Sequence, residues 1–194
     1  MDAALNAQKT ALRKQIRAAV QSISTERRME ASRQICTQLK EQPFWKKASA
    51  ILFFAPLPDE IDLWPLLEEA LTEAKVVALP CFDSEKESYT SRHVKNIQVE
   101  IISGQFGIRE PAPSCIEIPL DDLDLILVPG IAFDLRGNRL GRGKGFYDRL
   151  LPETRKLKCG IAFDEQIVAE IPAGTLDVPM DFILTPTRYV RVAD

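Results

Sequence analysis

One stretch of the sequence, from Leu125 to Leu151, restricts the possible folds of this chain more than any other. It opens with a short apolar run, Leu125 to Val128, whose length and composition predict a buried strand. Four glycines and four cationic side chains then lie between Arg136 and Gly145. The pattern from Phe146 onward is amphipathic and predicts the start of a helix. The stretch therefore predicts a strand, a glycine-rich cationic loop and a helix, in that order.

This combination is typical of a site that binds phosphate groups. Glycine lets backbone N–H groups approach a ligand closely and turn towards it. The positive end of a helix dipole adds to the attraction of an anion, and arginine and lysine add full charge and directional donors. A flexible surface loop with solvated charges is the alternative interpretation of the same residues.

Two common nucleotide-binding motifs do not fit the loop. A Walker A motif would need glycine where Asn138 stands and serine or threonine where Gly145 stands. The dinucleotide fingerprint begins at Gly141, but Phe146 occupies the position of its last glycine. The sequence therefore predicts a phosphate site that belongs neither to the P-loop fold nor to the dinucleotide-binding fold.

Length and charge limit the class of protein. The 194 residues suit one domain, 1–194, with a sizeable core. The net charge of −3, from 25 cations against 28 anions, argues against bulk nucleic-acid binding. No apolar run approaches the ~20 residues that span a membrane, and the N-terminus lacks the apolar segment of a signal peptide.

Cysteine and histidine usage narrows the chemistry. The four cysteines are far apart and form no C-x-x-C pair, which predicts reduced thiols in a cytoplasmic protein. The only histidine, His93, lies in a predicted strand, where a place on the sheet surface is its simplest explanation. Zinc chemistry and a Ser-His-Asp triad are therefore disfavoured.

The order of predicted elements indicates an α/β fold. Residues 5–22 form an amphipathic helix, and Ser24 or Thr25 begins a second one, which together predict an N-terminal helical hairpin. A strand at 49–55, a helix at 64–74 and a strand at 75–80 make a βαβ unit. Further strands are predicted at 89–94, 99–102, 123–128, 159–163, 182–184 and 189–192. We expect a three-layer α/β/α sandwich with a mostly parallel central sheet, of the kind found in sugar-phosphate isomerases and CoA transferases.

Charged residues outside the loop are further candidates for the site. Lys9, Arg13 and Arg17 form one basic edge of the first helix, which is either a solvated face or a set of phosphate ligands. Acidic residues follow the first strand, where ligands of open α/β sheets bind. Asp62 is predicted to cap the next helix, which leaves Glu60 as the preferred ligand contact.

Magnesium accompanies nucleoside triphosphates and prefers one or two carboxylates besides phosphate oxygens and water. Asp148 lies four residues beyond Lys144, at the start of the predicted helix, and Asp181 precedes a later strand. We expect both as metal ligands, although a helix-start acid and a turn residue are the plainer explanations.

Several motifs, in the right order over most of the chain, resemble one enzyme family. Asn138 to Asp148, N-R-L-G-R-G-K-G-F-Y-D, is similar to the signature of the 5-formyltetrahydrofolate cyclo-ligases, also called methenyltetrahydrofolate synthetases. Agreement extends to four further segments, at 9–13 (K-T-A-L-R), 59–62 (D-E-I-D), 105–111 (Q-F-G-I-R-E-P) and 124–134. One departure is Phe146, where the family more often has tyrosine.

The resemblance implies a reaction and its co-substrates. Such enzymes use ATP and Mg²⁺ to convert 5-formyltetrahydrofolate to 5,10-methenyltetrahydrofolate, releasing ADP and phosphate. The formyl oxygen attacks the γ-phosphoryl group, and N10 then closes the ring of the N5 iminium phosphate. Phosphoryl transfer needs positioning and charge neutralisation more than a nucleophilic side chain. The expected partners are then reduced folate and ATP. We expect a monomer that binds neither nucleic acid nor membranes.

The resemblance also implies roles for individual residues. Arg142 and Lys144 are expected to be catalytic, by stabilising charge on the transferring phosphoryl group. The implied ATP contacts are Lys9, Thr10, Ala11, Leu12, Arg13, Arg139, Leu140, Gly141, Arg142, Gly143, Lys144, Gly145, Phe146 and Tyr147. The implied folate contacts are Ala55, Glu60, Phe106, Arg142, Lys144, Phe146 and Tyr147. The implied magnesium ligands are Asp148 and Asp181.

Two other functions stay open at this point. A binding protein that retains both pockets without turnover would keep the same motifs. A sugar-phosphate isomerase or transferase on a related sheet would need a general base near the loop, and Glu60 is the only obvious candidate.

Overall fold

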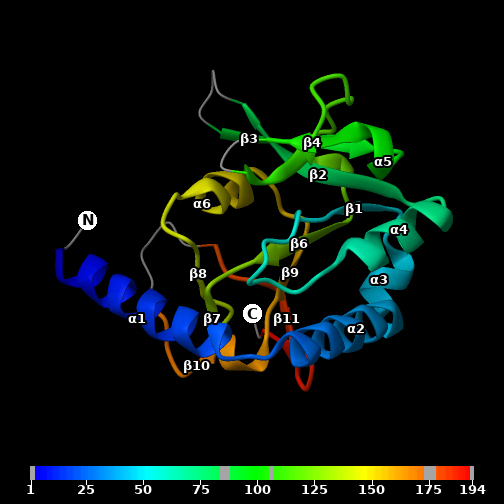
Figure 1. The fold of residues 1–194 in the computed structure, drawn as a ribbon. Coiled ribbons are helices and arrows are strands. Elements are labelled where there is room, and N and C mark those ends of the chain that lie inside the picture. The colour runs from blue at the N-terminus through cyan, green and yellow to red at the C-terminus, as the bar shows by residue number, and fades with distance from the viewer. Residues whose placement is uncertain (1–2, 84–87, 105–106, 173–177, 193–194) are drawn as a thin grey trace.

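A seven-stranded sheet runs through the middle of the molecule (Figure 1). The computed structural model describes residues 3–83, 88–104, 107–172 and 178–192. Neighbouring strands are parallel from β11 to β2, and the two edge strands, β12 and β3, are antiparallel. In spatial order the strands are β12 (Tyr189–Arg191), β11 (Phe182–Leu184), β9 (Leu157–Ile161), β6 (Leu125–Pro129), β1 (Ala50–Leu52), β2 (Val76–Asp83) and β3 (Ser88–Val94). The predicted mostly parallel sheet is confirmed.

The predicted βαβ unit forms as β1, α4 (Trp64–Thr72) and β2. Ala50 pairs with Val76 in parallel register. Asp62 Oδ1 accepts a hydrogen bond of 3.0 Å from the N–H of Trp64, the first helical residue, but the N-cap position of α4 is Leu63, whose side chain makes no cap. The Asp62 carboxylate thus binds at the start of the helix, from one residue before the N-cap.

Side chains of the strands alternate between two cores, as a pleated sheet requires. Ile51, Val77 and Leu127 belong to the core on one face, and Leu52, Ala78 and Ile126 to the core on the other. The first face is covered by α4 together with α1 (Ala3–Gln21), α2 (Thr25–Glu41) and α3 (Pro43–Lys47).

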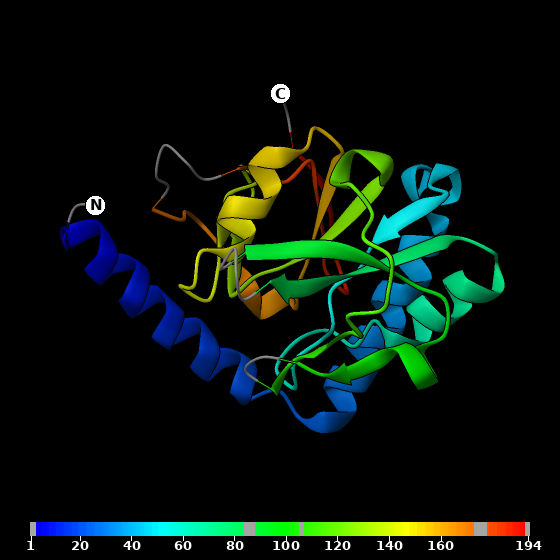
Figure 2. The same cartoon turned by 90° about the horizontal axis from the view of Figure 1, so that it is seen from above.

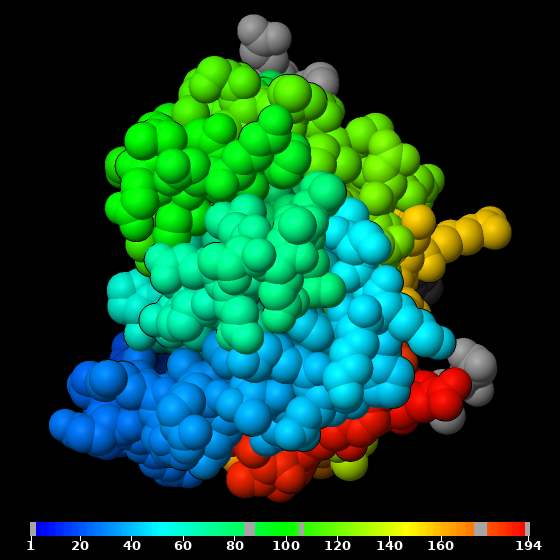
Figure 3. Space-filling model, turned by 90° about the vertical axis from the view of Figure 1, so that its right-hand side faces the viewer, coloured from blue at the N-terminus to red at the C-terminus, as the bar shows by residue number. Residues whose placement is uncertain are grey.

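The second face has a thinner cover. Leu150 and Leu151 pack on it from the short helix α6 (Phe146–Leu150) and the turn that follows. Figure 2 shows α6 on the opposite side of the sheet from α2. Figure 3 shows the side of the molecule that α2, α3 and α4 cover. The three predicted layers are present, with very unequal helical layers.

The two N-terminal helices form as predicted, but they do not pack as a hairpin. Ser24 caps α2 by accepting a hydrogen bond from the N–H of Arg27. Figures 1 and 2 show α1 and α2 diverging from the turn that joins them. The reason is that α1 buries only Ile16 and Val20, which lie in its C-terminal half and pack into the main core. Its N-terminal half extends away from the body of the protein.

Two smaller sheets complete the structure. One joins β4 (Ile101–Ser103) to β5 (Arg109–Pro111), next to α5 (Ile97–Glu100), and the other consists of β10 (Ile167–Val168), β7 (Ala132–Asp134) and β8 (Arg139–Leu140). The strand predicted at 99–102 is therefore half wrong. Asn96 caps a helical turn through the N–H of Gln98, and the strand starts only at Ile101.

The stretch from Leu125 to Leu151 contains more structure than a strand, a loop and a helix. The hairpin β7–β8 lies between the buried strand β6 and the glycines, and it takes Arg139 and Leu140 into a strand. Because α6 has only five residues, its dipole is a minor part of any anion site. Within the described ranges, no helix has both the length and the apolar character that crossing a bilayer requires.

Close packing against glycine attaches the β7–β8 hairpin to the central sheet. The fully buried ring of Phe133 lies so near Gly160 that a Cβ there would come within 2.6 Å of it. Gly160→Ala is therefore expected to lower the free energy of unfolding by about 1–3 kcal/mol, measured by urea denaturation. In a Phe133→Leu background the same change should cost less, because the smaller side chain leaves room for the methyl group. An equal cost in both backgrounds would contradict this packing account.

Candidate active site

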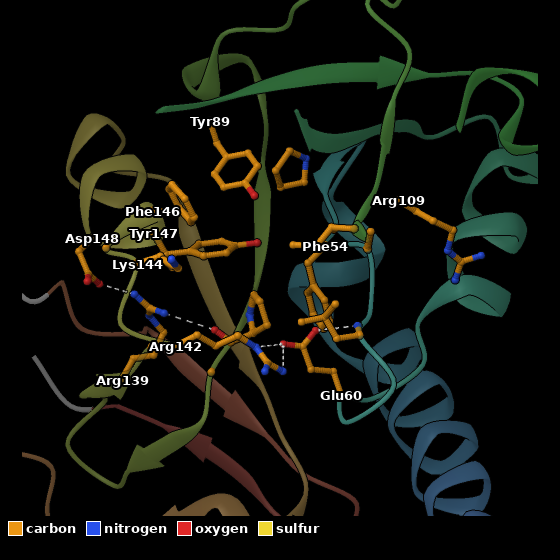
Figure 4. Close-up of a pocket in the computed structure, with 18 of the residues that line it drawn as sticks. Phe54, Glu60, Tyr89, Arg109, Arg139, Arg142, Lys144, Phe146, Tyr147 and Asp148 are labelled. Carbon is orange, nitrogen blue, oxygen red and sulfur yellow. Dashed lines mark hydrogen bonds and ion pairs between the residues drawn. The ribbon is translucent and has the colours of Figure 1, made fainter. Parts of the chain in front are cut away.

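A cavity of about 370 Å³ opens at the carboxyl ends of the central strands (Figure 4). Its walls include Phe54 and Ala55 after β1, and Pro129 and Gly130 at the end of β6. Parallel α/β sheets bind ligands at this edge because the strands there give way to loops. The predicted position of the site, at the strand ends, agrees with this cavity.

The glycine loop forms one side of the cavity. Gly141, Lys144 and Gly145 line it, and Gly143 and Gly145 have φ values of +95° and +68°. Other residues rarely adopt these left-handed conformations, which accounts for glycine at both positions. The loop exposes backbone and cationic groups to the same space, as an anion site requires.

The first helix reaches the loop, which supports the functional interpretation of its basic edge. Arg13 Nε donates a hydrogen bond of 2.9 Å to the carbonyl oxygen of Gly141. Burial and the neighbouring Arg17 lower the pKa of Arg13. Arg17 itself lines the cavity, whereas Lys9 lies one turn or more further out and does not. The structure thus brings Arg13 and Arg17 to the site.

The second side of the cavity is the loop after β1, and an ion-pair cluster joins it to the glycine loop. Arg142 Nη2 lies 2.6 Å from Asp59 Oδ1 and 2.9 Å from Glu60 Oε1, and its Nε donates to the same Glu60 oxygen at 3.1 Å. The other Glu60 oxygen accepts from the N–H of Leu57 at 3.0 Å. Figure 4 shows the contacts between Arg142 and Glu60.

This cluster changes the interpretation of Arg142. The sequence suggested a cation directed at phosphate, but its guanidinium is held by two carboxylates. Only 8% of the Glu60 side chain is exposed, and burial raises the pKa of its carboxyl, although Arg142 opposes the rise. Arg142 therefore lies between the two halves of the cavity and connects them.

The two carboxylates expected to bind magnesium lie apart. Asp148 lines the cavity and forms an ion pair with the buried Arg139. Asp181 is at the amino end of β11, where its carboxylate accepts from the N–H of Lys158 at 2.7 Å and lies 3.4 Å from Lys158 Nζ. Because amino and carboxyl ends of parallel strands face opposite edges of the sheet, Asp181 is outside the cavity. Asp181 is therefore too far from the loop to share a magnesium ion with Asp148, contrary to the prediction.

The described residues contain no group of three or more acidic, histidine or cysteine side chains arranged to hold a metal ion. Asp148 is therefore the carboxylate available at the loop. A magnesium ion that takes one protein carboxylate and several phosphate oxygens is compatible with this donor set.

Aromatic rings form the remaining wall. Phe146 packs edge-on against Tyr89 of β3 and Phe82 of β2, with ring centroids 4.7 and 5.6 Å apart. Tyr147 faces the Arg139 guanidinium at 5.3 Å. Burial raises the pKa of Tyr89 to about 12 and raises that of Tyr147 as well, so both phenols stay protonated at neutral pH. These rings offer a flat apolar surface with hydrogen-bond donors and no general base.

Other residues implied by the resemblance have mixed positions. Ala55, Phe146 and Tyr147 line the cavity as expected. Leu12 and Leu140 pack into the core, and Thr10 and Ala11 lie on the exposed side of α1, so none of these four side chains reaches it. Phe106 lies outside the described residues.

Sequence reasoning missed Phe54, Tyr89 and Arg109, all of which line the cavity. Phe54 continues an ordinary buried strand in the sequence. Tyr89 reaches the site only because β3 pairs antiparallel with β2. No short motif marks Phe54 or Tyr89, and Arg109 lies within the family-like segment 105–111.

The raised pKa of Glu60 has a consequence for stability. A carboxyl whose pKa is higher in the folded state makes that state bind more protons, so its contribution to stability falls as pH rises above the ordinary value of 4.5. The free energy of unfolding of the wild type, minus that of Glu60→Gln, should therefore be larger at pH 4 than at pH 7 in urea titrations. A larger difference at pH 7 would mean that Arg142 outweighs burial.

Comparisons with known proteins agree with this geometry. The model of the 5-formyltetrahydrofolate cyclo-ligase family matches residues 5–186. The 5-formyltetrahydrofolate cyclo-ligase of Escherichia coli K12 is 31% identical over 180 residues, which cover 89% of this chain and 97% of that protein. A probable 5-formyltetrahydrofolate cyclo-ligase of Schizosaccharomyces pombe is 34% identical over 174 residues, covering 81% and 84%.

The fold has a solved counterpart. The NMR structure of Aquifex aeolicus 5,10-methenyltetrahydrofolate synthetase superposes with a TM-score of 0.87 at 35% identity, and the match covers 96% of this chain and 93% of that one. Family model, relatives and structure agree over nearly the whole length of the chain. On this evidence the chain belongs to the 5-formyltetrahydrofolate cyclo-ligase family.

Proposed function

We propose that this protein converts 5-formyltetrahydrofolate to 5,10-methenyltetrahydrofolate with ATP and Mg²⁺, releasing ADP and phosphate. The observation that carries the proposal is the Arg142 cluster, which places a cationic glycine loop and the buried Glu60 carboxylate on one cavity. The glycine loop would bind the phosphates of ATP, and Glu60 would bind the pterin ring of the folate, within the same cavity. Membership of the cyclo-ligase family supports the same reaction.

The phosphate end of the site is assigned to the glycine loop and α1. Gly141 to Gly145 offer backbone donors, Lys144 and Arg139 offer charge, and Arg13 attaches the helix to the loop. Phosphoryl transfer is accelerated mainly by such positioning and charge neutralisation. Asp148 would hold the magnesium ion, which when bound neutralises charge on the phosphate oxygens.

The folate end is assigned to Glu60 and the aromatic wall. Glu60 Oε1 already accepts two hydrogen bonds from Arg142, whereas Oε2 accepts one, from Leu57, so Oε2 can accept one more from an N–H group of the pterin. Tyr147 and Phe146 then lie along the path from Glu60 to the phosphate end. This arrangement would bring the formyl group towards the phosphates.

The reaction proceeds in two steps. The formyl oxygen attacks the γ-phosphorus, the bond from that phosphorus to the bridging oxygen of ADP breaks, and the formyl group becomes an N5 iminium phosphate. N10 then attacks the formyl carbon and loses its proton, and the C–O bond to phosphate breaks to leave the methenyl bridge. Neither step needs a nucleophilic side chain, and the described residues of the cavity include no cysteine or histidine.

Family membership favours the cyclo-ligase over the isomerase or transferase alternative, because the family model and the relatives are 5-formyltetrahydrofolate cyclo-ligases over nearly the whole chain. The expectations of one domain, a monomer and a cytoplasmic location stay predictions.

The direct test is an assay of turnover. Purified protein with 5-formyltetrahydrofolate, ATP and MgCl₂ is expected to produce the methenyl product, followed by its absorbance, with one ADP formed per product. Omission of ATP or chelation of magnesium should abolish the signal. Folded protein that binds 5-formyltetrahydrofolate in calorimetry without forming product would instead be a binding protein, and product formed without ATP would contradict the phosphoryl-transfer mechanism.

The assigned role of Lys144 has a separate test. Because it lies in an exposed loop at the cavity, Lys144→Ala should lower kcat by about 10²–10³-fold while leaving the thermal midpoint nearly unchanged. Lys46→Ala, an exposed lysine on α3, serves as the matched control and should keep wild-type kcat. Loss of folding in Lys144→Ala would assign the residue a structural role.

A further inference from the structure

The cations around the cavity differ in how their charge is neutralised. At the loop end, Arg139 pairs with Asp148, and Arg142 pairs with Asp59 and Glu60. Arg109 lines the opposite rim, on the far side from Lys144 and Asp148 (Figure 4). Among the residues that the structure describes, Arg109 has no carboxylate partner, which sets it apart from Arg139 and Arg142.

The Arg109 side chain is nevertheless held in place. Its guanidinium carbon lies 4.0 Å from the centre of the Trp64 ring, at the start of α4. Its backbone belongs to β5, where it pairs with Ser103 of β4. Stacking uses one face of the guanidinium and leaves its N–H edges for an anion. A cation with restricted motion loses less entropy when it binds a ligand.

The chemistry of the substrate suggests what this cation meets. A reduced folate has a pterin at one end, an aromatic ring in the middle and a glutamyl group with two carboxylates at the other. With the pterin on Glu60, which is part of the proposed function, the substrate's aromatic ring lies against apolar walls such as Tyr89 and Ile108. The glutamyl group then leaves the cavity at a rim away from the phosphates.

We propose that Arg109 binds a glutamyl carboxylate of the reduced-folate substrate and thereby determines preference for glutamylated folates. Guanidinium and carboxylate match in geometry and can form two parallel hydrogen bonds. Because Arg109 is exposed, the pair is screened by solvent, and we expect an effect of about fivefold in affinity. The inference rests on the proposed function for the identity and the orientation of the substrate.

The experiment compares two ligands and four proteins. Calorimetry measures Kd for 5-formyltetrahydrofolate and for 5-formyltetrahydropteroate, which lacks the glutamyl group, and the turnover assay measures KM and kcat for both. The wild type should prefer the glutamylated compound by about fivefold, and Arg109→Gln should lose that preference with kcat retained. Arg109→Lys should keep part of it. Arg33→Gln, an exposed arginine of α2 paired with Glu30, is the control and should behave as the wild type.

Three results would overturn the proposal. An equal loss of affinity for both compounds would mean that Arg109 only shapes the rim. A rise in the Kd for ATP would mean that it meets phosphate, and no change would mean that it meets neither. The proposed function is judged separately, by turnover. If the protein shows no turnover but Arg109→Gln still removes the binding preference, the proposed function is contradicted and the Arg109 subsite is supported. If the protein turns over but Arg109→Gln leaves the preference unchanged, the subsite is contradicted and the proposed function is supported.

Discussion

The contact of Arg142 with Asp59 and Glu60 is the interaction on which the site depends. It joins residues 82 and 83 positions apart in the sequence, from the glycine loop and from the loop after β1. Two carboxylates on one guanidinium leave a local excess of negative charge, and burial makes the ionised form of Glu60 costly. Removing Arg142 would leave that acid unpaired, so the pair specifies the distance between the two halves of the cavity.

The same two halves are connected a second time, through the N-terminal helices. Arg28 of α2 donates to the carbonyl oxygens of Val20 and Ile23 at the end of α1, at 2.6 and 3.1 Å, and to that of Pro58 at 2.9 Å. One side chain thus fixes both the helix that carries Arg13 and the loop that carries Glu60. A helix that buries so little of its own surface needs such contacts to hold a defined direction.

Charge around the cavity is arranged before any ligand arrives. Arg139 and Arg142 are already paired with carboxylates, so their positions cost no reorganisation when substrates bind. The aromatic wall adds protonated phenols next to these pairs. The rim at Arg109 differs, since its cation stacks on Trp64 and faces solvent. The paired arginines of the interior are thus held in place for the reaction, whereas the Arg109 guanidinium at the rim is exposed to bind part of a ligand.

The sequence by itself determined the local elements, the glycine motif and the family. Apolar runs, caps and glycine positions act over a few residues, so the βαβ unit, the Ser24 cap and the loop at 137–145 could be read directly. Only the tertiary structure decided which charges meet. It paired Arg142 with Glu60, placed Asp181 with Lys158 at the wrong edge of the sheet, and brought Tyr89 to the cavity through strand pairing. Ion pairs and strand partners depend on contacts between distant segments, which no local pattern encodes.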